Sequence, residues 1–187
     1  MRDHLAHVPP AKCALSPPKH SGIMGGKFIQ RGRVKKPNKL RRWLAKLLED
    51  PAFVRTLVFT RTKHGADRVA KHLLRAGIPS HAIHGNKSQG ARERALGEFR
   101  DGKAIVLVAT DIASRGIDVD EITHVVNYDM PIEPESYVHR IGRTGRAGEK
   151  GISHTFMDPS KEAKYARALT DIMQKAGQRL PMELAQM

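Results

Sequence analysis

Five short runs of apolar residues, separated by segments with helical periodicity, constrain the fold of this 187-residue chain more than any other feature. Strands that are apolar almost throughout are buried on both faces, as in a parallel sheet covered by helices. The pattern therefore predicts an α/β fold, a three-layer domain with a mainly parallel central sheet flanked by helices. The expected strands are 56–60, 80–84, 104–110, 124–128 and 152–157, and the expected helices are 38–50, 63–76, 88–101, 134–142 and 160–176.

Positive charge is concentrated at the N-terminus. The formal net charge is +14, and residues 1–43 hold 11 Lys and Arg against one acid. An excess of this kind is typical of proteins that bind nucleic acid. Residues 1–33 contain Pro and Gly pairs without an apolar period, so we expect a disordered basic arm there. Both an inert leader and an RNA-binding arm remain open. The folded domain is expected over 34–176, with a C-terminal tail at 177–187.

Composition excludes several classes of protein. The single cysteine, Cys13, excludes a disulfide framework and a Cys-based zinc site, and we expect no metal site. No apolar run approaches the roughly 20 residues that span a bilayer. We therefore expect a cytoplasmic monomer without membrane contacts. Residues 21–28 lack the first glycine and the Ser or Thr of a P-loop, so the chain should not hydrolyse a nucleotide by itself.

The stretch 137–148, YVHRIGRTGRAG, carries the strongest chemical signal. His139, Arg143 and Arg146 recur at spacings that one side of a helix and the following glycine turn bring together. Three potential cations on one face repel each other unless an anion neutralises them, and Arg forks bind phosphate oxygens in pairs. The pattern predicts a phosphate-binding site, with a solvated basic helix as the alternative.

This stretch resembles motif VI of the DEAD-box RNA helicases, members of helicase superfamily 2. Three more motifs of their C-terminal lobe precede it in order, since 57–63 resembles motif IV, 84–92 contains the Gln-x-x-Arg element and 109–118 resembles motif V. The resemblance implies a RecA-like fold. It also implies that Arg143 and Arg146 are arginine fingers on ATP, that His139 couples the nucleotide to the partner lobe, and that Gly116 and Asp118 bind the nucleotide. Turn capping is the alternative for Asp118.

The same resemblance places RNA contacts where the expected strands end. The Thr110 hydroxyl and nearby backbone N–H groups suit a phosphate of the RNA backbone. For Asp111, capping of a short helix at 112–115 is the favoured alternative. Thr62 could equally cap the helix that follows it. The full set of expected RNA-binding residues is Thr62, His84, Gly85, Gln89, Arg92, Thr110 and Asp111.

The chain contains no Gln motif, no Walker A loop and no Asp-Glu-Ala-Asp sequence. In the family these belong to an N-terminal RecA-like lobe, which also holds Mg²⁺. We therefore expect the C-terminal lobe of an ATP-dependent helicase that remodels or unwinds RNA, a fragment that is inactive without its partner lobe. A stand-alone RNA-binding or regulatory module without ATPase activity is the alternative, and a DNA helicase is a third possibility.

Overall fold

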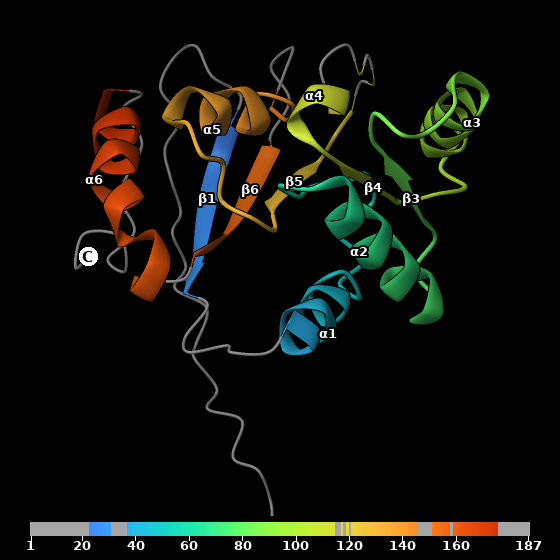
Figure 1. The fold of residues 1–187 in the computed structure, drawn as a ribbon, viewed down its shortest axis with the longest axis horizontal. Helices are drawn as coiled ribbons and strands as arrows, with labels where there is room; N and C mark the ends of the chain where they lie inside the picture. The colour runs from blue at the N-terminus through green and yellow to red at the C-terminus, as the bar shows by residue number, and fades with distance from the viewer. Residues whose placement is uncertain are drawn as a thin grey trace, which may run out of the picture.

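In the part of the chain that the structure describes, six parallel strands form the central sheet, with helices on both faces (Figure 1). The computed structural model describes residues 23–30, 37–114, 117, 119, 121–145, 151–157 and 159–175. The strands are β1 (Ile23–Gln30), β2 (Thr56–Phe59), β3 (Ser80–Ile83), β4 (Val106–Ala109), β5 (His124–Asn127) and β6 (Gly151–Met157). The helices are α1 (Pro37–Leu47), α2 (Lys63–Arg75), α3 (Gln89–Arg100), α4 (Asp111–Ser114), α5 (Pro134–Ile141) and α6 (Pro159–Lys175).

The sheet has the strand order β1-β6-β5-β2-β4-β3, and every neighbouring pair is parallel. This confirms the expected α/β class, and the five expected strands and five expected helices all occur within a few residues of their predicted bounds. The prediction succeeds because β2, β4 and β5 are buried at every position, which requires apolar or uncharged residues throughout.

β1 corrects the expected domain boundary. Residues 23–30 were expected to belong to the N-terminal arm, but they pair with β6 from Ile23 opposite Gly151 to Gln30 opposite Met157. An edge strand is held through one backbone ladder, so its own sequence needs no continuous apolar run. The strand register shifts between Ile23 and Gly26, and this irregularity accommodates the pair Gly25-Gly26, which is typical of a linker in sequence. The other residues of the expected arm and those of the tail lie outside the described residues.

Successive residues of the strands face opposite sides of the sheet and build two cores. Val58 and Val108 pack with Leu44 of α1 and Leu73 of α2 on one side. On the other side, a second cluster contains Leu57, Phe59, Leu107 and Phe99 of α3. A third, smaller cluster joins α5 and α6 to the end of β6. Within the described residues, no helix is long and apolar enough to cross a membrane.

Candidate functional site

The candidate site residues lie along the edge of the sheet where the strands end. Because all strands are parallel, their carboxyl ends share one edge, which is where α/β domains bind ligands. Thr62 follows β2, His84 follows β3 and Thr110 follows β4, and these three strands are direct neighbours in the sheet. α5 follows β5, which is the neighbour of β2 on the other side. Figure 1 shows α4 and α5 along this upper edge.

Arg140 joins the segments that carry the resembling motifs V and VI. Its Nε and Nη2 donate to the two carboxylate oxygens of Asp111 at 2.5 and 2.7 Å. Its Nη1 donates to the backbone oxygen of Asp129 at 2.6 Å and to Asn127 Oδ1 at 3.3 Å. The guanidinium carbon lies 5.0 Å from the centre of the Phe59 ring. Arg140 is only 1% exposed, so these contacts hold α5 firmly against the ends of β2, β4 and β5.

This ion pair gives a structural role to Asp111, which was expected to contact RNA or to cap a short helix. Both oxygens of its carboxylate accept hydrogen bonds from Arg140, and the side chain remains 35% exposed at the carboxyl edge. The reason is the buried guanidinium, which requires a charged partner inside the protein. The sequence contains one signal for the role of Arg140. It shares a helical stripe with Tyr137, Ile141 and Thr144, which are buried or half-buried, and a cation in such a stripe needs an internal anion.

His139 and Arg143 lie on the same stretch, away from this buried stripe. His139 is exposed and Arg143 is half-buried. α5 ends at Ile141, but the N–H groups of Arg143 and Thr144 still donate to carbonyls three residues earlier at 3.1 Å, so the chain continues in a tighter turn. Arg143 therefore follows His139 by about one helical turn, as expected. The other expected nucleotide contacts, Gly116, Asp118 and Arg146, lie outside the described residues.

The turn after α5 is fixed against β6. The Thr144 hydroxyl donates to the backbone oxygen of Ile122, and Gly145 has a φ of +67°, which favours glycine. Gly151, at the start of β6, lies so close that a Cβ there would be 2.3 Å from Thr144 Oγ1 and 2.4 Å from the Gly145 nitrogen. These contacts determine the direction in which the chain leaves Arg143.

Thr62 is the N-cap of α2. Its Oγ1 accepts a hydrogen bond from the backbone N–H of Gly65 at 3.0 Å, which confirms the capping interpretation. The side chain is nevertheless exposed, so it remains within reach of a ligand at the edge of the sheet.

His84 has a structural environment that its sequence position does not reveal. It is 3% exposed, and its Nε2 lies 3.0 Å from Asp67 Oδ2 of α2. Lys87 Nζ lies 2.9 Å from the other oxygen of Asp67. Partial burial raises the pKa of Asp67, but its polar and charge interactions with Lys87 and His84 outweigh this effect, and the net pKa is lowered. The His84 side chain therefore joins β3 to α2, and the expected RNA contact at the strand end that His84 forms with Gly85 stays a prediction.

The remaining candidates for RNA contact are accessible. Gly85 and Gln89 are exposed, and Gln89 Nε2 donates to Glu93 Oε1 at 2.8 Å. Arg92 and Thr110 are half-buried. No group of three or more His, Cys, Asp or Glu side chains lies together in the described part of the chain, which therefore presents no candidate metal cluster.

Residues 36–148 match the family described as the helicase conserved C-terminal domain. The chain is 50% identical over 145 residues to DEAD-box ATP-dependent RNA helicase 20 of Arabidopsis thaliana, which covers 77% of this chain and 29% of that protein. It is 47% identical over 152 residues to ATP-dependent RNA helicase dbp2 of Aspergillus clavatus, covering 81% and 27%. The chain thus spans less than a third of the length of these curated relatives.

Solved structures show the same similarity. The RNA helicase Prp28 from Chaetomium thermophilum, bound to ADP, superimposes with a TM-score of 0.76 at 36% identity, over 87% of this chain and 39% of that chain. The E. coli DEAD-box protein SrmB, bound to the regulator of ribonuclease activity A, superimposes with a TM-score of 0.68 at 32% identity, over 87% and 92% of the two chains.

Proposed function

This chain belongs to the DEAD-box RNA helicases as their conserved C-terminal helicase domain, and from that premise we propose that it completes an ATPase site together with an N-terminal RecA-like lobe. The intact pair of lobes would couple ATP binding and hydrolysis to local unwinding or remodelling of RNA. One observation carries the proposal: the ion pair between buried Arg140 and Asp111 holds α5 in place, with His139 exposed on α5 and Arg143 half-buried just after it.

The residues at this edge fit an anionic nucleotide. Arg143 would stabilise negative charge that develops on the transferred phosphoryl group, as arginine fingers do. We assign Arg146 the same role and His139 a contact with the partner lobe. Gly116 and Asp118 would meet the ribose. ATP supplies the phosphoanhydride bond whose hydrolysis releases the free energy, and Mg²⁺ would be held by the N-terminal lobe.

RNA would bind along the neighbouring strand ends. Gly85, Gln89, Arg92 and Thr110 are accessible there, and Thr62 lies next to them. Their backbone and side-chain donors suit phosphate oxygens, and contacts to phosphates carry no direct sequence information. Binding should therefore be nearly independent of base sequence.

The experiment compares the chain alone with the chain fused behind an N-terminal lobe from a relative such as Arabidopsis helicase 20. We expect RNA-stimulated ATP turnover only in the fusion, because the chain lacks a P-loop. Turnover by the chain alone that is abolished by Arg143→Ala would contradict the two-lobe mechanism. A fusion that binds RNA but never hydrolyses ATP would favour the stand-alone RNA-binding module instead.

A further inference from the structure

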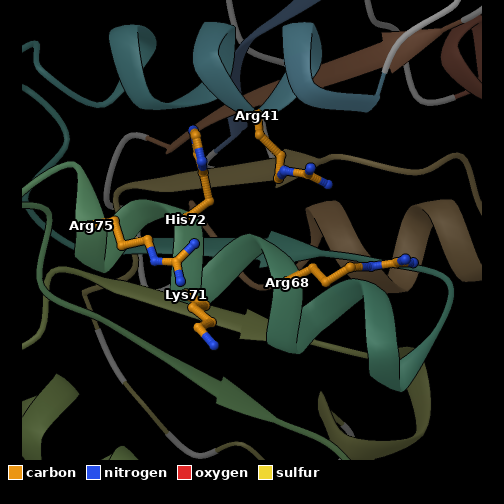
Figure 2. Close-up of a pocket in the computed structure, with 5 residues that line it drawn as sticks. All are labelled: Arg41, Arg68, Lys71, His72 and Arg75. Carbon is orange, nitrogen blue, oxygen red and sulfur yellow. The ribbon is translucent and has the colours of Figure 1, made fainter.

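A cavity of about 150 Å³ lies between α1 and α2, and the described residues that line it are all basic. Its lining consists of Arg41 from α1 and Arg68, Lys71, His72 and Arg75 from α2. Figure 2 shows His72 directed from α2 toward α1 and Arg41 directed from α1 toward α2. The cavity contains none of the residues of the carboxyl-edge site.

The spacing of the basic residues on α2 explains how they come together. Arg68, Lys71, His72 and Arg75 follow one another at intervals of three, one and three residues, so they form one stripe along the helix. The buried residues of α2 form a separate stripe against the sheet, comprising Ala66, Val69, Ala70 and Leu73. At 1.5 Å per residue, the basic stripe extends over about 10 Å.

Positive charge gathers in this lining, and three of its cations lack a counter-ion within the described residues. It includes no carboxylate, and none of Arg68, Lys71 and Arg75 forms an ion pair with a carboxylate of the described residues. The electrostatic effect is visible at the centre of the group. Burial lowers the pKa of His72 below its ordinary value of 6.5, and the charges of Arg41, Arg75 and Arg42 lower it further. The cavity is therefore a place where an anion relieves repulsion.

We propose that this cavity binds the phosphate backbone of RNA as a second contact surface, separate from the residues at the strand ends. Arg forks match phosphate oxygens, and cations spread over about 10 Å of α2 can meet neighbouring phosphates of one strand. An acidic peptide is the less suitable occupant, because protein partners usually anchor an apolar or aromatic side chain, and the described lining residues include no apolar one to receive it.

The position of α2 supports the same assignment. The helix begins directly after its cap Thr62 at the carboxyl edge, and Arg68 lies six residues later, about 9 Å along the axis. RNA that contacts the strand ends can therefore continue along α2 into the cavity. The inference extends the proposed RNA binding, but it requires neither ATP nor the partner lobe.

The test uses the full chain and a fluorescent 12-nucleotide single-stranded RNA. Arg68→Gln combined with Arg75→Gln should lower the slope of log affinity against log salt by about 1.4, or about 0.7 for each lost phosphate contact. The affinity loss between 50 and 200 mM salt should then be about sevenfold smaller than in the unchanged chain. The matched control combines Arg167→Gln and Lys175→Gln, which removes the same charge from exposed positions on α6.

Equal salt slopes for the two double variants would overturn the proposal. A second readout follows the His72 imidazole by NMR, where addition of the RNA should raise its pKa and inorganic phosphate should do so less. An unchanged His72 pKa at saturating RNA would also overturn it. If a polyglutamate peptide binds more tightly than the RNA and only the α2 variant loses it, the surface is a protein-docking site. A fusion that fails to hydrolyse ATP leaves these results intact, so the two proposals fail separately.

Discussion

Arg140 and Asp111, 29 positions apart in the sequence, form a two-bond ion pair that connects α5 to α4. The arginine side chain is 2% exposed, whereas the aspartate side chain is 35% exposed. The cation is therefore enclosed by the protein, and its anion is the part of the pair that meets solvent. Any conformational change that separates α5 from α4 would leave a buried charge without its partner.

Replacement of Asp111 by Ala should destabilise the domain by about 3 kcal/mol, because removal of one partner leaves the other charge buried. Urea unfolding measures the loss. Asp171→Ala, at an exposed position of α6, is the control and should change stability by less than about 0.5 kcal/mol. A loss below about 1 kcal/mol for Asp111→Ala would show that water compensates Arg140 and that the pair does not hold α5.

Arg143→Lys and Arg146→Lys in the two-lobe fusion should each reduce ATP turnover by a factor on the order of 10³ or more. Lys keeps the charge but loses the planar fork, so the loss would identify geometry as the requirement. Steady-state ATPase rates at saturating RNA provide the measurement. Arg167→Lys on α6 is the control and should leave the rate unchanged. If both variants keep rates within about threefold of the parent, these arginines only contribute positive charge to the surface and do not act as arginine fingers.

The fold was largely predictable because its strands are buried on both faces. β2 and β4 are completely buried, and all their residues except Thr56 are apolar, so their sequences alone identify them as central strands. β1 escaped prediction for the opposite reason. It pairs with the backbone of β6, more than 100 residues away in the sequence. The sequence of residues 23–30 alone therefore does not indicate that a partner strand is present.

The candidate site was predictable only where it depends on helical spacing. The placement of His139 and Arg143 about one helical turn apart was predictable from their four-residue spacing. The engagement of Asp111 by Arg140 and of His84 by Asp67 could not be inferred in the same way, because each pair is brought together by the order of strands in the sheet and by helix packing. The basic cavity likewise requires α1 to lie against α2.

Deletion of residues 1–33 should destabilise the protein, whereas deletion of residues 1–22 should not. The longer deletion removes β1 and exposes the backbone ladder of β6, which is then available for pairing with other chains. Thermal unfolding and light scattering should show a lower unfolding temperature and aggregation for the longer deletion only. If both truncated proteins unfold like the parent, β1 contributes nothing to stability.

His72 makes stability depend on pH. Its pKa in the folded protein lies below the ordinary 6.5, so the unfolded chain binds the proton more readily. The associated stability is present above pH 6.5 and is lost as the pH falls below it. Unfolding free energies at pH 8 and pH 5.5 should therefore differ less in His72→Gln than in the parent. His64→Gln, an exposed change on the same helix, should retain the parent's difference. Identical pH dependence in all three proteins would contradict this assignment.

Gly151→Ala should destabilise the domain by about 1–3 kcal/mol, because the new methyl group overlaps Thr144 and the backbone of Gly145. Gly97→Ala offers a control of opposite sign. A Cβ at Gly97 meets nothing within 4 Å. In the interior of a helix such as α3, alanine is more stable than glycine by about 0.5–1 kcal/mol, so this variant should be stabilised. Urea unfolding of the two variants compares them directly. A neutral Gly151→Ala would mean that the turn after α5 can move away from β6.

The pairing of β1 with β6 sets an order of events during biosynthesis. β1 leaves the ribosome before its partner strand, which begins at Gly151. At about 5–20 residues per second, the intervening ~120 residues take on the order of 10 s to synthesise. During that interval the nascent β1 has no native edge to join. Chaperones that bind emerging chains would therefore find this segment available until nearly the whole domain has been translated.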